Sequence, residues 1–122
     1  MAGRTSLRSV LGLLALVLGV SLASQWWSQQ QAGEVGQQLA ALAAPGDIVM
    51  LSSDTCAPCL AARRWMQQHK VAFAECSIER DADCAERFRT AGAPGTPLLF
   101  VRGQPQLGFV PERLRAALQR PA

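Results

Sequence analysis

Two cysteines separated by two residues carry the most distinctive chemistry of this chain. Cys56 and Cys59 enclose Ala57 and Pro58, directly after an apolar run and before a helical pattern. A cysteine delivered to the first turn of a helix lies near unpaired backbone N–H groups and the positive end of the helix dipole. The thiolate is favoured there, and the thiolate is the nucleophile in disulfide exchange. The spacing therefore predicts a redox-active dithiol, with a purely structural or inert pair as the alternative.

The N-terminal segment is typical of an export signal. Residues 10–23 are uncharged and almost wholly apolar, and they follow Arg4 and Arg8. Extending the segment through two adjacent tryptophans to residue 27 gives about 27 Å of helix, which is enough to span a bilayer. The Ser-Leu-Ala sequence at 21–23 resembles a cleavage site. The tryptophans suit the far membrane interface and favour an uncleaved anchor.

These features predict a single-pass protein of the cytoplasmic (inner) membrane, with its C-terminal domain on the periplasmic side. Cleavage would instead leave a soluble periplasmic protein. Four cysteines in a chain of 122 residues also point to an oxidising compartment, where dithiols can form disulfides.

The charge balance gives no reason to expect a nucleic-acid partner. The net charge is +3, but two of the 12 basic residues precede the apolar segment, which leaves ten basic residues against nine acidic ones. No basic stripe follows. Arg63 and Arg64 read as a solvated helix face, with steering of a substrate or thiol as the alternative.

The chain divides into a signal or anchor helix over 1–27, a linker over 28–46 with a short helix around 35–43, and one domain over 47–122. In the domain, hydrophobic periodicity alternates between strand and helix. We expect strands at 48–51 and 71–76, helices at 57–69 and from about 83 to Gly92, a strand at 98–101, a turn into a strand ending at Phe109, and a helix from Pro111. Asp54 or Thr55 is the expected cap of the first of these helices. The predicted order is β-α-β-α-β-β-α.

Three features carry a family resemblance. They are the run Ser-Asp-Thr-Cys-Ala-Pro-Cys at 53–59, Thr96-Pro97 before an apolar strand, and a Gly-containing turn before a closing helix. Together they resemble the glutaredoxin branch of the thioredoxin-like superfamily, over residues 47 to about 119. The resemblance implies an α/β thioredoxin-like fold with a mixed four-stranded sheet, and a thiol–disulfide oxidoreductase activity.

The resemblance also implies roles for single residues. Cys56 is the exposed attacking thiol, and Cys59 resolves the mixed disulfide from one helical turn away. Pro97 is expected to form a cis peptide bond and to pack against the dithiol, which leaves the backbone of Thr96 for an extended substrate. Ala57 and Pro58 complete the predicted substrate contacts. A proline at the start of a strand also needs no function.

No cofactor is expected. Glutaredoxins that use glutathione typically carry Pro-Tyr inside the motif, a basic residue shortly before it and a Gly-Gly-x-Asp-like stretch before the last helix. Here these positions hold Ala57-Pro58, Ser53 and the sequence Gly-Phe-Val-Pro at 108–111, which puts glutathione as a co-substrate in doubt. The expected partners are exported proteins with disulfides or dithiols, a membrane or soluble redox partner, and the membrane itself through the N-terminal helix.

The second cysteine pair has an informative spacing. Cys76 lies at the end of an expected strand and Cys84 in the first turn of the next helix, so a disulfide closing this loop is reasonable. Two buried thiols and a redox relay to the first pair are the alternatives. No metal is expected, because the second spacing does not form a zinc knuckle and the prolines disfavour metal at the first pair. His69 is expected to be solvated.

The redox direction stays open, although Pro58 favours the reducing end of the range. A carrier of Cu(I) is a second hypothesis, since two thiolates bind that ion. Small copper chaperones usually have Met two residues before the first cysteine, where this chain has Asp54. A third hypothesis is a redox-inactive binding or assembly module.

Overall fold

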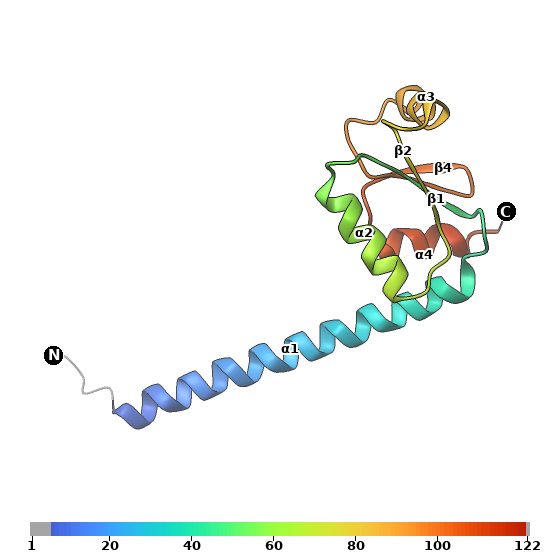
Figure 1. Cartoon of the computed structure of the whole chain (residues 1–122). Coiled ribbons are helices and arrows are strands. Elements are labelled where there is room, and N and C mark those ends of the chain that lie inside the picture. Colours follow the sequence, from blue (N-terminus) through green and yellow to red (C-terminus); the bar gives the residue numbers. More distant parts are fainter. Residues whose placement is uncertain (1–5, 122) are drawn as a thin grey trace. The chain divides into compact units, whose positions relative to one another are not determined.

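A mixed four-stranded sheet forms the centre of the C-terminal domain (Figure 1). The structure is a computed structural model that describes residues 6–121. The strands are β1 (Ile48–Ser52), β2 (Ala74–Ser77), β3 (Leu98–Val101) and β4 (Gln104–Leu107), and the helices are α1 (Leu7–Leu42), α2 (Ala57–Gln68), α3 (Ala82–Ala91) and α4 (Pro111–Gln119). The sheet order is β2-β1-β3-β4, with β1 and β2 parallel and the other neighbours antiparallel. The predicted element order is confirmed for the domain.

Helices cover both faces of the sheet. Along β1, Ile48 and Met50 point to one face while Val49 and Leu51 point to the other, as the two-residue period of a strand requires. Helices α2 and α4 and the end of α1 cover the first face, and α3 covers the second (Figure 1). A central strand that is buried on both faces explains the continuous apolar run in the sequence.

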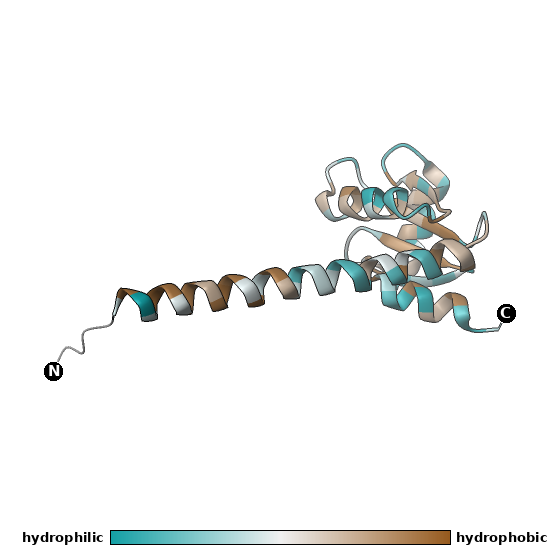
Figure 2. Ribbon diagram, turned by 90° about the horizontal axis from the view of Figure 1, so that it is seen from below, coloured by the Kyte–Doolittle hydropathy of each residue, from teal (hydrophilic) through white to brown (hydrophobic). Residues whose placement is uncertain are grey.

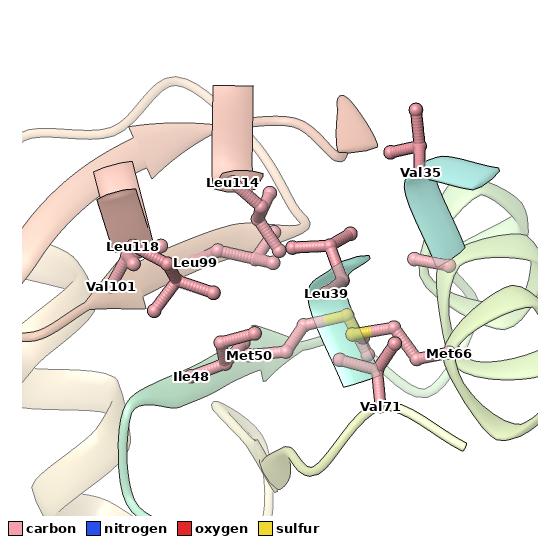
Figure 3. Packing of buried hydrophobic residues seen from close by; sticks show 11 residues of the cluster. Val35, Leu39, Ile48, Met50, Met66, Val71, Leu99, Val101, Leu114 and Leu118 are labelled. Atoms are coloured by element: carbon pink, nitrogen blue, oxygen red, sulfur yellow. The ribbon is translucent and has the colours of Figure 1, made fainter. Parts of the chain in front are cut away.

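The larger hydrophobic cluster lies on the first face. Figure 3 shows Leu39 of α1 among Met50, Met66, Leu99 and Leu114, which come from four different elements. The buried members of the cluster are Val35, Leu39, Ile48, Met50, Ala62, Met66, Val71, Leu99, Val101, Leu114 and Leu118. Because α2 contributes Ala62 and Met66 to this cluster, the cluster fixes the helix that begins at the first cysteine pair.

The smaller cluster joins α3 to the second face. Its buried members are Leu51, Cys84 and Leu98, and Phe88 and Phe100 pack against them. The guanidinium carbon of Arg87 lies 4.3 Å from the centroid of the Phe100 ring, which is within the range of a cation–π contact.

The N-terminal part of the chain, up to Gly33, forms a unit of its own. There α1 is apolar and exposed (Figure 2), and it is long and apolar enough to cross a membrane, although a signal sequence has the same properties. Hydroxyl groups of Ser21, Ser24 and Ser28 donate to backbone carbonyl oxygens within the helix. Bonds of this kind satisfy polar groups without water. Arg4 lies outside the described residues.

The expected linker over 28–46 differs from the structure. Helix α1 continues to Leu42, and Val35 and Leu39 are buried in the larger cluster. The second unit of the chain accordingly begins at Glu34, before the predicted domain boundary at Asp47. The physical reason is that Val35 and Leu39 lie one helical turn apart, so that both face the sheet.

Two strand boundaries also differ from the prediction. β2 begins at Ala74 and not at Val71, because Lys70 has a positive φ of 55° and the Val71 N–H still bonds to the Met66 carbonyl at the end of α2. β4 ends at Leu107 and not at Phe109, and it begins at Gln104, directly after Arg102 and Gly103, whose φ angles are 49° and 83°. Two consecutive positive φ angles match the right-handed twist of a hairpin, so a two-residue turn is sufficient.

Candidate active site

The first cysteine pair lies where β1 gives way to α2. Cys56 is the residue that caps α2, and its Sγ accepts a hydrogen bond of 3.1 Å from the backbone N–H of Cys59. The prediction that Asp54 or Thr55 caps this helix is wrong, because the cysteine itself occupies the cap position. Cys56 and Cys59 form a disulfide with their Cα atoms 5.2 Å apart, and Pro58 lies in the first turn, where no N–H is needed.

The two sulfur positions differ in their access to solvent. Cys59 is fully buried, whereas Cys56 is half-buried and lines an open polar cavity at the end of β1. An external disulfide can therefore approach Cys56, and Cys59 can be reached only through it.

Pro97 lies at the start of β3 and is buried, and the Thr96–Pro97 peptide bond is cis, as the resemblance implied. The carbonyl oxygen of Pro97 accepts a 2.9 Å hydrogen bond from the N–H of Gly108. Thr96 precedes the first paired residue of β3, so its backbone lies outside the ladder of the sheet.

An apolar groove joins the two predicted elements of the site. Pro58 of α2 and Pro97 both line it, together with Trp65 and Phe109, whose ring centroids are 5.4 Å apart in an edge-to-face arrangement. None of the described residues that line this groove is charged. Cys56 therefore lies between a polar cavity on one side of α2 and an apolar groove that begins beside Pro58.

The polar cavity contains an ion pair between neighbouring elements. Arg63 of α2 donates to both carboxylate oxygens of Glu75 on β2, with Nε 2.7 Å from Oε2. These hydrogen bonds from Arg63 lower the pKa of Glu75 below its usual value of 4.5, against the opposing effect of burial. The same bonds raise the pKa of Arg63. Arg63 is thus paired with Glu75 while its side chain stays partly exposed, and Arg64 is exposed, as the interpretation of a solvated helix face predicted.

The second pair, Cys76 and Cys84, also forms a disulfide, with Cα atoms 6.4 Å apart. It links the end of β2 to the first turn of α3 and closes the loop between them. This is the disulfide that the spacing of the two cysteines predicted. Cys84 belongs to the cluster on the α3 face. In the described part of the chain, no group of three or more His, Cys, Asp or Glu residues could hold a metal ion.

Comparison with known proteins agrees with this geometry. The family model described as Glutaredoxin matches residues 48–105, which include both strands around the dithiol, the cis-proline segment and the start of β4. This is a glutaredoxin-like thioredoxin fold.

Solved structures resemble the glutaredoxin-like domain at low sequence identity. The thioredoxin-like protein BC3987 is 24% identical, with a TM-score of 0.51 over 57% of this chain and 97% of that one. A single-residue mutant of the same protein gives a TM-score of 0.53 at 24% identity over 60% and 95%. The glutaredoxin from Archaeoglobus fulgidus is 16% identical, with a TM-score of 0.49 over 61% and 87%. The likeness to BC3987 and its mutant concerns the fold alone, and no curated protein matches the chain.

The glutaredoxin-like domain contains polar partners that sequence reasoning did not identify. Glu75 was not singled out, and neither was Glu79, whose carboxylate bonds to the turn before Cys56. His69, expected to be solvated, is half-buried and stacks on Trp65 with ring centroids 4.1 Å apart. The two-residue period of β2 is the one signal for its position, because it places Glu75 on the face opposite to Cys76, which packs against the smaller cluster.

Proposed function

We propose that this chain is a membrane-tethered thiol–disulfide oxidoreductase that acts on exported proteins or small disulfides. The observation that carries the proposal is the cysteine pair at the start of α2, in which Cys56 is accessible and Cys59 is buried behind it. The fold and the matching family model support a thiol–disulfide redox function in general.

In the reducing direction, the Cys56 thiolate attacks one sulfur of a substrate disulfide. A new S–S bond joins Cys56 to the substrate, and the other substrate sulfur leaves as a thiolate. Cys59 then loses its proton and attacks Cys56 Sγ, which forms the internal disulfide and releases the second substrate thiol. Two electrons pass to the substrate, and a dithiol donor must restore the pair.

The Cys59 N–H assists this chemistry. It already donates to Cys56 Sγ, and the same bond together with the helix dipole stabilises the thiolate when the pair is reduced. In the oxidising direction, the same stabilisation makes Cys56 the better leaving group when a second substrate thiol displaces it from the mixed disulfide. No bound cofactor is needed, because the electrons reside in the cysteine pair.

The apolar groove suits a polypeptide substrate. Its lining includes Pro58, Thr96 and Pro97 and carries no charge among the described residues. It therefore offers no partner for the carboxylates of glutathione. The unpaired backbone beside Thr96 can bond to an extended segment, as an added strand does at a sheet edge.

The N-terminal helix supplies the tether in this proposal. Its exposed apolar side chains over residues 10–22 suit a bilayer, and Trp26 and Trp27 suit the interface. The basic residue Arg8 would then face the cytoplasm and the domain the periplasm. Fractionation of cells and protease protection of a C-terminal tag test the anchor and its sidedness, and a shortened, soluble mature chain would show that the signal is cleaved.

Turnover is tested with the full chain in detergent micelles. We expect catalysis of insulin reduction by dithiothreitol, abolished in Cys56→Ser and retained in Gln67→Ala, which changes an exposed position on α2. Stoichiometric Cu(I) uptake without turnover would favour the carrier, and neither activity would leave a binding module. A reduction potential near the thioredoxin value of about −270 mV supports the reducing direction, whereas one near about −120 mV supports oxidation of substrates.

A further inference from the structure

The turn that precedes Cys56 is held by the carboxylate of Glu79, which lies in the loop after the neighbouring strand β2. Ser53 donates from Oγ to Glu79 Oε1 at 2.7 Å, and the backbone N–H of Asp54 donates to Glu79 Oε2 at 2.9 Å. Within the turn, the Cys56 N–H bonds to the Ser53 carbonyl at 3.3 Å. Both oxygens of one side chain thus fix consecutive residues of the segment that delivers Cys56 to the helix.

The loop that carries Glu79 is in turn held by Asp54, which belongs to the turn before Cys56. Asp54 accepts hydrogen bonds of 3.2 Å from Ser77 Oγ and from Arg80 Nε. Burial opposes ionisation of Asp54, but the bonds from Arg80 and Ser77 together lower its pKa. The N–H of Glu79 donates to Ser77 Oγ at 3.2 Å. The two segments therefore bond reciprocally through side chains on both.

The Cys76–Cys84 disulfide closes the same loop. Cys76 immediately precedes Ser77, and Cys84 lies in the first turn of α3, so the bridge ties both ends of the segment that contains Glu79. Asp81 caps α3 by accepting from the backbone N–H groups of Asp83 and Cys84. Reduction of the bridge would leave the hydrogen bonds and the packing of Ile78 against the smaller cluster to define the loop.

We propose that Glu79 is a positioning residue for Cys56, and that the Cys76–Cys84 disulfide acts on the dithiol by keeping Glu79 in place. The proposal rests on the proposed role of Cys56 as the attacking thiol. Glu79 touches neither sulfur in this arrangement. It holds the turn so that Cys56 Sγ stays in the cap position, where it accepts the hydrogen bond from the Cys59 N–H.

The test separates the charge of Glu79 from its geometry. The full chain in micelles is reduced so that mass spectrometry finds Cys56 and Cys59 as thiols and the other pair still bridged. The rate at which iodoacetamide modifies Cys56 is then followed against pH. Glu79→Gln removes the charge and keeps an amide oxygen as acceptor, whereas Glu79→Ala removes both. Glu86→Ala is the matched control, because it removes an exposed carboxylate of α3 outside this network.

We expect Glu79→Ala to modify Cys56 more slowly than Glu79→Gln at pH 7, by about two- to tenfold, the factor given by the net loss of one hydrogen bond. The control should match the unsubstituted chain. Equal rates for the alanine and glutamine variants would overturn the positioning role. A chain whose Cys56 does not titrate below about pH 8 would instead refute the proposed function itself.

The second disulfide is tested by a double-mutant cycle. The chain with both Cys76→Ala and Cys84→Ala should show the same slowing as Glu79→Ala, and adding Glu79→Ala to it should slow the reaction little further, because both changes act through one contact. Independent, additive effects would overturn the link between the bridge and Glu79. Circular dichroism identifies any variant that does not fold. If the chain without the second disulfide is unfolded, the comparison of Glu79→Ala with Glu79→Gln still tests the positioning role.

Discussion

Replacing Leu39 by alanine tests whether the end of α1 belongs to the folded domain. Leu39 is fully buried and contacts residues from α2, α4 and the sheet in the larger cluster (Figure 3). The substitution removes three carbon atoms from the core, and at about 0.8 kcal/mol per buried methylene this loses about 2.4 kcal/mol. Incomplete collapse of the cavity raises the expected loss to about 3 to 4 kcal/mol.

The assay is urea unfolding of the full oxidised chain in detergent micelles, followed by far-ultraviolet circular dichroism. We expect the midpoint to fall strongly for Leu39→Ala with an unchanged dependence on urea, which indicates altered stability and not altered compactness. Gln37→Ala is the matched control, because Gln37 is exposed two positions earlier on the same helix. Its effect should stay within about 0.5 kcal/mol.

The refuting result is a loss below about 1 kcal/mol for Leu39→Ala, which is the range of a partly exposed side chain. Residues 34–42 would then behave as the linker that the sequence predicted. Such a result would also mean that Leu39 does not anchor the end of α1 to α2 through the larger cluster.

Further predictions concern contacts around the same helix and the polar cavity. Gly36→Ala should destabilise the domain by about 1 to 3 kcal/mol, because the added Cβ would overlap with the ring of His69. Adding His69→Ala should restore part of this loss, and Gly33→Ala, which meets nothing within 4 Å, should be neutral or stabilising. Equal effects at both glycines in thermal unfolding would contradict the close approach. Glu75→Gln should cost about 1 kcal/mol at pH 7, a value limited by solvent screening of the exposed part of Arg63. Because the folded-state pKa of Glu75 is lowered, this contribution is present above about pH 4.5 and is lost as the pH falls through the folded-state value. A difference from the unsubstituted chain that does not shrink as the pH is lowered from 7 would contradict the pairing.

The dithiol and the sheet could be predicted because their signals are local. The continuous apolar run of β1 and the adjacent Cys-Ala-Pro-Cys motif place the pair at a strand-to-helix junction, and the structure has them there. The same holds for the second pair, whose spacing fits a loop between β2 and α3. Such features depend on residues that are close in sequence, so spacing alone is informative.

The polar partners of the site could not be predicted in the same way. Glu79 lies 26 residues from Ser53 and Glu75 lies 12 residues from Arg63. Each contact depends on the parallel register of β1 and β2, in which Ser52 pairs with Ser77. A one-residue shift of that register would turn Glu75 away from α2. The register of β1 and β2 cannot be inferred from the spacing of residues in the sequence, because Arg63 and Glu75 belong to separate elements.

The end of α1 shows how composition can hide a packed element. Between the tryptophans and the Pro-Gly that precedes β1, the segment is rich in glutamine and alanine, and its apolar residues Val35, Leu39 and Leu42 are few. Their spacing of four and three is nevertheless the period of one helix face. Val35 and Leu39 are buried, and Leu42 packs against the cluster. Gly36 on the adjoining position admits the His69 ring. The apolar period of this segment, and not its polar composition, therefore determines where the domain begins.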